Sequence, residues 1–376
     1  MSPLRRWFEA RLELGRELGA ATLRPMEGLR GVAVLLVFLV HYATLVSPWV
    51  PAHGPASVIL DAVHAIGNVG VDLFFVLSGF LIYGGLIVAE RPFLDYLWRR
   101  VRRIYPAFLA VFALYLVLSI GLGRTENLPR EPGAATLYVL WNLLLLPGLT
   151  PIKPLIAVAW SLSYEFCFYL LAPLVIALTG LRQRSRRWRV GFIVLMTVLA
   201  LAGFAIWGGP VRMTMFLAGM LLHEWLSGEN PPGCSAVVGL AAGLLALAVP
   251  LVPMPGPALQ ALRVGLIYAG FFCLCLAAFQ RPGNALGRCL AWTPLRWMGN
   301  VSYSYYLLHG LALQAFFSVA QRFISPGHDG LALALLLPAW LATLPPCLML
   351  FLLIERPLSL APKSATARSP AAALKS

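Results

Sequence analysis

The stretch EGLRGVAVLLVFLVHY, residues 27–42, decides how this chain folds. Its apolar part begins a segment that can cross a bilayer, which takes about 20 predominantly apolar residues in a helix. The stretch places Arg30 at the mouth of that helix and His41 about three turns further in. Ionisable side chains inside a bilayer are costly, so a histidine at this place indicates a functional residue.

The composition of the whole chain points to the same class of protein. Of the 376 residues, 60% are hydrophobic and 12% are charged, which excludes an ordinary soluble globular protein. The net charge of +14 is concentrated in arginine-rich loops between apolar runs, a pattern that orients membrane proteins. We therefore predict the lipid bilayer as the partner of this chain, and we predict no nucleic acid partner.

The predicted fold is an all-α, polytopic transmembrane helix bundle with about ten spanning helices. Apolar segments of spanning length begin near residues 31, 66, 104, 158, 190, 211, 234, 262, 299 and 331. A shorter apolar run, 136–149, contains Asn142 and Pro147, and we expect it to form a re-entrant or interfacial segment.

Charge placement predicts the orientation and the boundaries of the domain. The arginine-rich loops share one side if ten helices span, which puts both termini in the cytoplasm and leaves residues 47–65 as an external loop. Residues 1–24 are predicted to form a cytoplasmic amphipathic segment, residues 25–358 the transmembrane domain, and residues 359–376 a disordered cytoplasmic tail.

A few ionisable residues stand inside the apolar segments. By helix rise, His41, Asp72 and Glu165 are all expected about 10 Å below the outer surface, and His309 near the midplane. We expect Asp72 to orient His41, because a carboxylate on one ring nitrogen fixes the tautomer of an imidazole. Packing between helices is the alternative use of such polar groups.

Two kinds of function fit these residue types. A histidine held by a carboxylate can deprotonate a hydroxyl, or its ring can carry an acyl group. The same groups could form the proton path of a proton-coupled transporter or flippase for a lipid-linked sugar, although the chain shows no internal repeat of the kind common in transporters. Arg30, Arg100 and Arg103 are expected at the cytoplasmic face, where guanidinium groups suit phosphate recognition or serve only to orient the chain.

Six segments then follow one another along residues 24–358: EGLRGVAVLLVFLVH, GNVGVDLFFVLSGFLI, RRVRRIYPAF, WSLSYEFCFYLLAP, GNVSYSYYLLH and IERP. In this order they resemble the acyltransferase-3 family of integral membrane acyltransferases, which includes O-antigen acetylases. The resemblance implies an enzyme of the bacterial inner membrane that moves an acyl group to a hydroxyl of a carbohydrate or glycolipid. It implies acyl-coenzyme A, most often acetyl-coenzyme A, as the donor substrate, with no bound cofactor and no metal.

The resemblance also implies which residues act. It assigns catalysis to His41, Asp72 and Glu165, with His41 as base or acyl carrier, and donor binding to Arg30, Arg100 and Arg103, and it adds His309 and Glu355 as further candidates. Where many members of the family have a second glutamate and a glutamine, this chain has Phe166 and Cys167, so no role for a second carboxylate is available. The acceptor and the length of the acyl group stay open.

Overall fold

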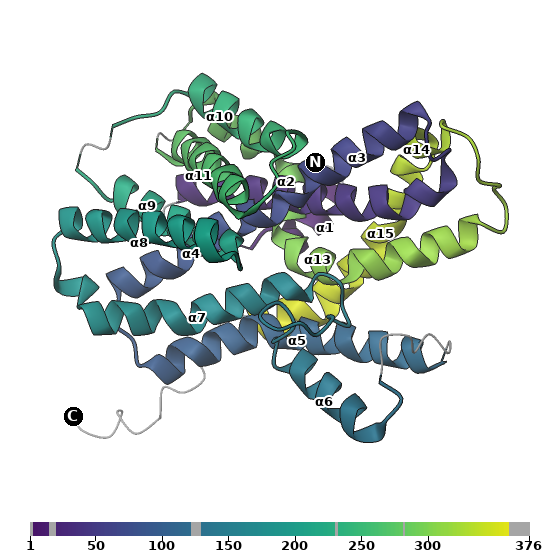
Figure 1. Cartoon of the computed structure of the whole chain (residues 1–376), viewed down its shortest axis with the longest axis horizontal. Coiled ribbons are helices and arrows are strands. Elements are labelled where there is room, and N and C mark those ends of the chain that lie inside the picture. The colour runs from purple at the N-terminus through teal and green to yellow at the C-terminus, as the bar shows by residue number, and fades with distance from the viewer. Residues whose placement is uncertain (1–2, 15–19, 122–128, 230–231, 281–282, 361–376) are drawn as a thin grey trace.

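The structure is a computed structural model that describes residues 3–14, 20–121, 129–229, 232–280 and 283–360. Throughout these described ranges the regular structure is helical and contains no strand (Figure 1). The prediction of a polytopic, all-helical bundle is confirmed.

The α-helices follow one another along the chain with short connections. They are α1 (Pro3–Leu12), α2 (Ala20–Val46), α3 (Pro55–Asn68), α4 (Gly70–Val88), α5 (Phe93–Gly121), α6 (Pro132–Leu143), α7 (Ala159–Thr179), α8 (Arg186–Trp207), α9 (Thr214–Leu226), α10 (Ala236–Ala248), α11 (Pro257–Phe279), α12 (Ala285–Leu290), α13 (Thr293–Ala320), α14 (Leu331–Ala334) and α15 (Leu336–Leu350). A π-helix, Phe351–Leu360, continues α15 directly.

A helix lies at each of the ten predicted spans: α2, α4, α5, α7, α8, α9, α10, α11, α13 and α15. Among the described residues, seven helical segments are long and apolar enough to cross a membrane. The other predicted spans depart from that standard in two ways. Helices α9 and α10 have 13 residues each, about 20 Å of helix, and α13 is 28 residues long but rich in polar side chains. The count of ten crossings stays a prediction.

The directions of neighbouring helices agree with the ten-span order. The first and ninth spans, α2 and α13, run in the same direction, because Arg30 contacts Ser302 and the later residue His41 contacts the later residue His309. The second and sixth spans, α4 and α9, are also parallel, and the consecutive spans α10 and α11 are antiparallel. If each span crosses the membrane in turn, two odd-numbered or two even-numbered spans must be parallel, and consecutive spans must be antiparallel.

Glycines allow the central helices to approach closely. A Cβ on Gly299 of α13 would lie 1.7 Å from the carbonyl oxygen of Glu27, and one on Gly31 of α2 would lie 2.2 Å from that of Leu295. Helices α4 and α9 approach in the same manner. Small residues at helix contacts are typical of membrane proteins, because lipid offers no hydrophobic drive for helix association. Gly31 of the EGLRG stretch and Gly299 therefore allow α2 and α13 to pack closely.

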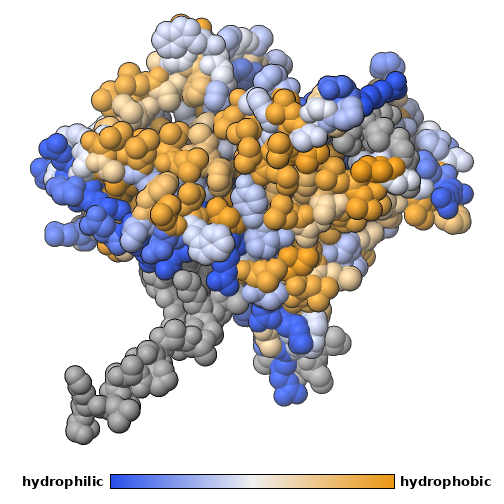
Figure 2. Space-filling view, turned by 90° about the horizontal axis from the view of Figure 1, so that it is seen from below, coloured by the Kyte–Doolittle hydropathy of each residue, from blue (hydrophilic) through white to orange (hydrophobic). Residues whose placement is uncertain are grey.

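The surface agrees with a surrounding bilayer. Large apolar side chains are exposed along several helices, and Trp207, Leu178 and Val237 are each more than three quarters exposed. Figure 2 shows such residues as a broad apolar area across one face, with hydrophilic residues towards its edges. An apolar area of this size is typical of a surface that contacts lipid.

The region predicted as an external loop is largely helical. Residues 47–65 contain a 3-10 turn, Ser47–Trp49, and most of α3, which packs against α2 and is separated from α4 only at Val69. The expectation of a loop is wrong here, because α3 is apolar on the side where Ala56 and Leu60 are buried.

The short apolar run at residues 136–149 forms the end of α6 and a folded loop. Helix α6 has 12 residues, about 18 Å, which is too short to cross a bilayer. The loop turns back onto α7, where Ser163 Oγ accepts a hydrogen bond from the amide of Gly148 at 3.0 Å, and Asn142 Oδ1 accepts one from the amide of Leu155 at 2.8 Å. A segment that does not span the bilayer is consistent with this geometry.

The two ends of the chain differ in what the structure describes. The predicted helix near the N-terminus is present as α1, and its Phe8 and Leu12 pack with Trp297 and Phe351 on the bundle. The predicted tail begins at residue 359, within the π-helix, and residues 361–376 lie outside the described residues. The proposed domain boundaries stay predictions.

Candidate active site

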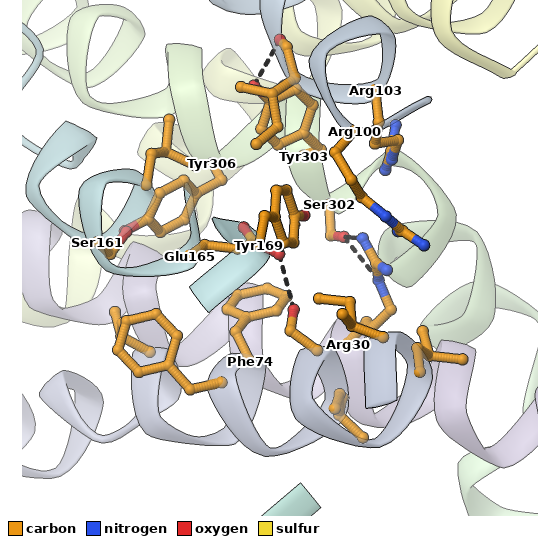
Figure 3. Close-up of a pocket in the computed structure, with 18 of the residues that line it drawn as sticks. Arg30, Phe74, Arg100, Arg103, Ser161, Glu165, Tyr169, Ser302, Tyr303 and Tyr306 are labelled. Carbon is orange, nitrogen blue, oxygen red and sulfur yellow. Dashed lines mark hydrogen bonds between the residues drawn. The ribbon is translucent and has the colours of Figure 1, made fainter. Parts of the chain in front are cut away.

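A cavity of about 260 Å³ lies between α2, α4, α5, α7 and α13, and the end of the π-helix also contributes to its wall. Arg30, Arg100 and Arg103 lie together on one side of it (Figure 3). Ser161 and Tyr306 lie on the other side. The cavity therefore has a cationic side and a side formed by hydroxyl-bearing, aromatic and aliphatic groups.

Two of the cavity arginines have no carboxylate partner among the described residues. The Nη2 atom of Arg30 donates to Ser302 Oγ at 3.1 Å. The guanidinium of Arg100 lies over the rings of Tyr96 and Tyr169, at 5.3 and 5.5 Å from their centroids, and its buried Nε has no hydrogen-bond partner within the described chain. These two side chains are available to an anionic ligand.

The third cavity arginine is held by a buried carboxylate. Arg103 Nη1 lies 2.5 Å from Oε1 of Glu355, whose side chain is fully buried. The other oxygen of Glu355 accepts hydrogen bonds from the amide and the hydroxyl of Ser304, at 3.0 and 2.5 Å. Glu355 lies in the π-helix, a rare conformation that is frequent at functional sites. It therefore lies behind the cavity and fixes Arg103 in the cavity wall.

Glu165 lies between the two sides of the cavity (Figure 3). Its Oε1 accepts hydrogen bonds from Ser78 Oγ and from Tyr169 Oη, both at 2.8 Å. Since Ser78 follows Asp72 on α4 by a helical rise of about 9 Å, Glu165 lies deeper in the bundle than Asp72. The expectation that both acids lie at one depth is wrong.

His41 and His309 contact each other outside the cavity lining. His41 Nδ1 lies 3.2 Å from His309 Nε2, and the two rings meet edge to face with centroids 4.7 Å apart. His41 Nδ1 also lies 2.9 Å from the carbonyl oxygen of Val37, and His309 Nδ1 lies 2.8 Å from that of Tyr305. The structure thus joins two histidines that are far apart in the sequence.

The carbonyl contacts fix the tautomers of the neutral pair. A carbonyl oxygen only accepts, so His309 Nδ1 carries a hydrogen and His309 Nε2 is an acceptor. Both neighbours of His41 Nδ1 are then acceptors, so this nitrogen carries the hydrogen. His41 Nε2 is left unprotonated and forms no hydrogen bond with the described part of the chain, so it can accept a proton.

Asp72 does not pair with His41, and that prediction is wrong. Its two oxygens accept hydrogen bonds from Arg212 Nε and Nη2, at 2.8 and 2.9 Å. Arg212 also donates to Asn68 and lies over the ring of Trp160, 5.1 Å from its centroid. A two-point arginine contact binds a carboxylate more strongly than an imidazole does, which is why Asp72 joins α4 to α9 instead.

Several residues of the site were not singled out in the sequence. Arg212 is an isolated arginine at the start of a short apolar helix, and that isolation was a usable signal. Ser302 and Tyr306 precede His309 at helical spacing on one face of α13. The hydroxyls of Ser302 and Tyr306 could therefore have been connected with His309 from the sequence. Ser161 contacts Tyr306 Oη at 2.6 Å and had no signal in the sequence.

Comparisons with known proteins identify several relatives. Over 323 residues the chain is 29% identical to the putative peptidoglycan O-acetyltransferase YrhL of Bacillus subtilis (strain 168), covering 76% of this chain and 47% of the relative. It is 28% identical to the exopolysaccharide production protein ExoZ of Rhizobium meliloti (strain 1021), with 66% of this chain and 77% of the relative covered. It is 26% identical to the acyltransferase MdmB of Streptomyces mycarofaciens, with 93% and 97% covered.

The extent of these matches limits what they say about the whole protein. The chain spans about half the length of the Bacillus relative. No solved structure shows a significant match to this one. The sequence model of the acyltransferase-3 family, described as an acyltransferase domain, matches residues 25–355, and this chain therefore belongs to that family.

Proposed function

We propose that this protein is a membrane O-acyltransferase that moves an acyl group from acyl-coenzyme A to a hydroxyl of a carbohydrate or glycolipid. The relatives named as a peptidoglycan O-acetyltransferase and an exopolysaccharide production protein support a carbohydrate acceptor. Membership of an acyltransferase family favours this function over the transporter or flippase considered from the sequence. The observation that carries the choice of donor is the group of cavity arginines.

The cationic side of the cavity suits the phosphates of coenzyme A. Arg30 and Arg100 lack carboxylate partners among the described residues, and Arg103 is fixed beside them by Glu355. Guanidinium groups bind phosphate through two parallel hydrogen bonds, which a hydroxyl or an aromatic face does not replace. The acyl arm of the donor then runs past Glu165 towards the aromatic side of the cavity.

His41 takes the proton of the acceptor hydroxyl at its free Nε2, and His309 holds its ring in the required tautomer. The acceptor oxygen attacks the thioester carbonyl, the carbon–sulfur bond breaks, and the coenzyme leaves as a thiolate that takes the proton from His41. In the carrier alternative His41 itself attacks the thioester, so the acyl carbon has to come into direct contact with His41, which is not among the residues that line the cavity; as a base, His41 has to reach only the proton of the acceptor hydroxyl.

The proposal also includes the orientation of the protein in the membrane. Arg30 and the arginines of α5 face the cytoplasm of a bacterial inner membrane, where acyl-coenzyme A is available, and both termini lie on that side. His41 lies about 16 Å further along α2, towards the outer surface. The acceptor approaches from there.

The test is His41→Ala, compared with the exposed His53→Ala as a matched control. With purified protein, acetyl-coenzyme A and an envelope glycan fraction, release of the free thiol measures transfer. We expect His41→Ala to lower kcat by about 10²- to 10⁴-fold, because it removes a general base, and His53→Ala to leave it unchanged.

Donor binding is measured separately by thermal unfolding. Acetyl-coenzyme A should raise the unfolding temperature of both variants, since a ligand of the native state stabilises it by mass action. Full activity of His41→Ala would exclude His41 as the base. If acetyl-coenzyme A neither stabilises the wild-type protein nor reacts, the proposed donor is wrong.

A further inference from the structure

Two aromatic rings in contact with each other, those of Phe74 and Tyr306, line the cavity that receives the donor. We propose that Phe74 and Tyr306 form the end wall of the acyl site and limit the donor to short acyl groups such as acetyl. This inference rests on the proposed function, because it takes the cavity as the donor site. It adds the residues that select the length of the acyl group.

The two sides of the cavity give the donor one direction. The arginines lie on one side and Tyr306 and Ser161 lie on the other (Figure 3), and the ring of Phe74 lies beside that of Tyr306. A donor whose phosphates bind the arginines places its thioester and acyl group at the far side. The acyl carbons therefore meet apolar surface there, formed by Phe74 and by Val71 one turn earlier on α4.

The wall is a contact between α4 and α13. The rings of Phe74 and Tyr306 meet edge to face, with centroids 6.0 Å apart and planes at 73°. Tyr306 cannot turn away without losing the hydroxyl contact with Ser161 at 2.6 Å and its hydrogen bond to the carbonyl oxygen of Val158 at 3.2 Å. A ring anchored in this way forms a rigid stop, against which Phe74 is packed.

The wall also stands next to the proposed base. The backbone oxygen of Tyr306 lies 3.0 Å from His309 Nδ1, and the two rings have centroids 6.4 Å apart. Tyr306 is thus part of the wall and also part of the surroundings of the histidine pair, and an acyl chain longer than the space before the wall would have to displace one of the two rings. Rigid apolar pockets distinguish substrates by one methylene about 10- to 200-fold, so this wall is sufficient for selection.

The test compares acetyl-, propionyl- and butyryl-coenzyme A as donors for the wild-type protein and for Phe74→Ala. The wild-type kcat/KM should be at least about 10-fold higher for acetyl than for butyryl. Removing the Phe74 ring opens space beyond the wall, and the preference should fall by about 10-fold or more. Leu81→Ala is the matched control, because Leu81 lines the same cavity two turns nearer the arginines and its loss should leave the preference unchanged.

The outcomes separate this inference from the function on which it rests. If the wild-type protein uses none of the three donors, the proposed function fails and the wall fails with it. If it uses acetyl-coenzyme A but Phe74→Ala keeps the wild-type preference, only the wall is refuted; a wild-type preference for butyryl also refutes it. Should Phe74→Ala unfold, Phe74→Leu keeps an apolar contact with Tyr306, and an unchanged donor preference in that folded variant refutes the wall equally.

Discussion

Two groups of arginines in this molecule differ in the partners that their guanidinium groups bind. Between α8 and α9, Arg189 binds both oxygens of the fully buried Glu224, at 2.6 and 2.9 Å, and Tyr83 donates to the same carboxylate. Arg186 donates to the backbone oxygens of Glu224 and Trp225. These arginines have protein partners and join helices.

The cavity group has the opposite character. Within the residues that the structure describes, neither Arg30 nor Arg100 has a salt bridge: Arg30 donates to the hydroxyl of Ser302, and Arg100 lies over the rings of Tyr96 and Tyr169. In the sequence, Arg100 and Arg103 of the cavity group and the arginines of α8 lie in similar arginine-rich stretches beside apolar runs, and that pattern predicts orientation alone. The difference teaches that the lack of a carboxylate partner, and not the number of arginines, marks a site for an external anion.

The largest effect is expected for Glu224→Ala. It leaves the half-buried Arg189 without its carboxylate and Tyr83 without its acceptor, and loss of one member of a buried ion pair costs up to about 3–5 kcal/mol. Thermal unfolding in detergent should show a strong loss of stability, whereas the exposed Glu229→Ala should not. If Glu224→Ala keeps wild-type stability, the α8–α9 group is not structural and the comparison breaks.

An intermediate effect is expected for Arg100→Gln. Its stability should match that of the wild-type protein, since Arg100 has no carboxylate to lose, but its Kd for acetyl-coenzyme A should rise about 10- to 150-fold, the equivalent of about 1.5–3 kcal/mol for a hydrogen bond to a charged group. Isothermal titration measures the Kd. Arg99→Gln, on the exposed side of the same helix, is the control, and equal donor affinity in all three proteins would contradict the assignment of the cavity group.

The smallest effect is expected for Glu90→Gln. Glu90 is 87% exposed and lies 3.4 Å from Arg182, and exposed pairs contribute about 0.2–1 kcal/mol. Both the unfolding temperature and the donor Kd should stay close to wild type. A loss as large as that of Glu224→Ala would show that burial is not what separates the strong pairs from the weak ones.

Much of the fold could be predicted because hydrophobic periodicity and length are local properties. Helices occur at all ten predicted spans, and the short run at 136–149 does not form a spanning helix. Helix α3 was missed because the expectation of a loop rested on the lack of lysine and arginine in residues 47–65. A lack of lysine and arginine predicts a side of the membrane, not a loop.

The candidate site was predicted less completely, because pairing depends on which helices meet. The cavity contains Arg30, Arg100, Arg103 and Glu165 together, but Asp72 binds Arg212 instead of His41. The rise per residue gives the position of a residue along its own helix. It does not give the direction in which the residue points around the helix axis. The contact between His41 and His309 follows only from the packing of α2 on α13.

That packing has a consequence for protein engineering. Helices α2 and α13 carry the two proposed ends of the reaction jointly, with Arg30 on Ser302 at one end and His41 on His309 at the other. The glycine contacts between Gly299 and Glu27 leave no space for a change of register. A chimera that takes α2 alone from a relative would misalign both ends at once, so the two helices form the smallest unit that can be exchanged between enzymes of this family.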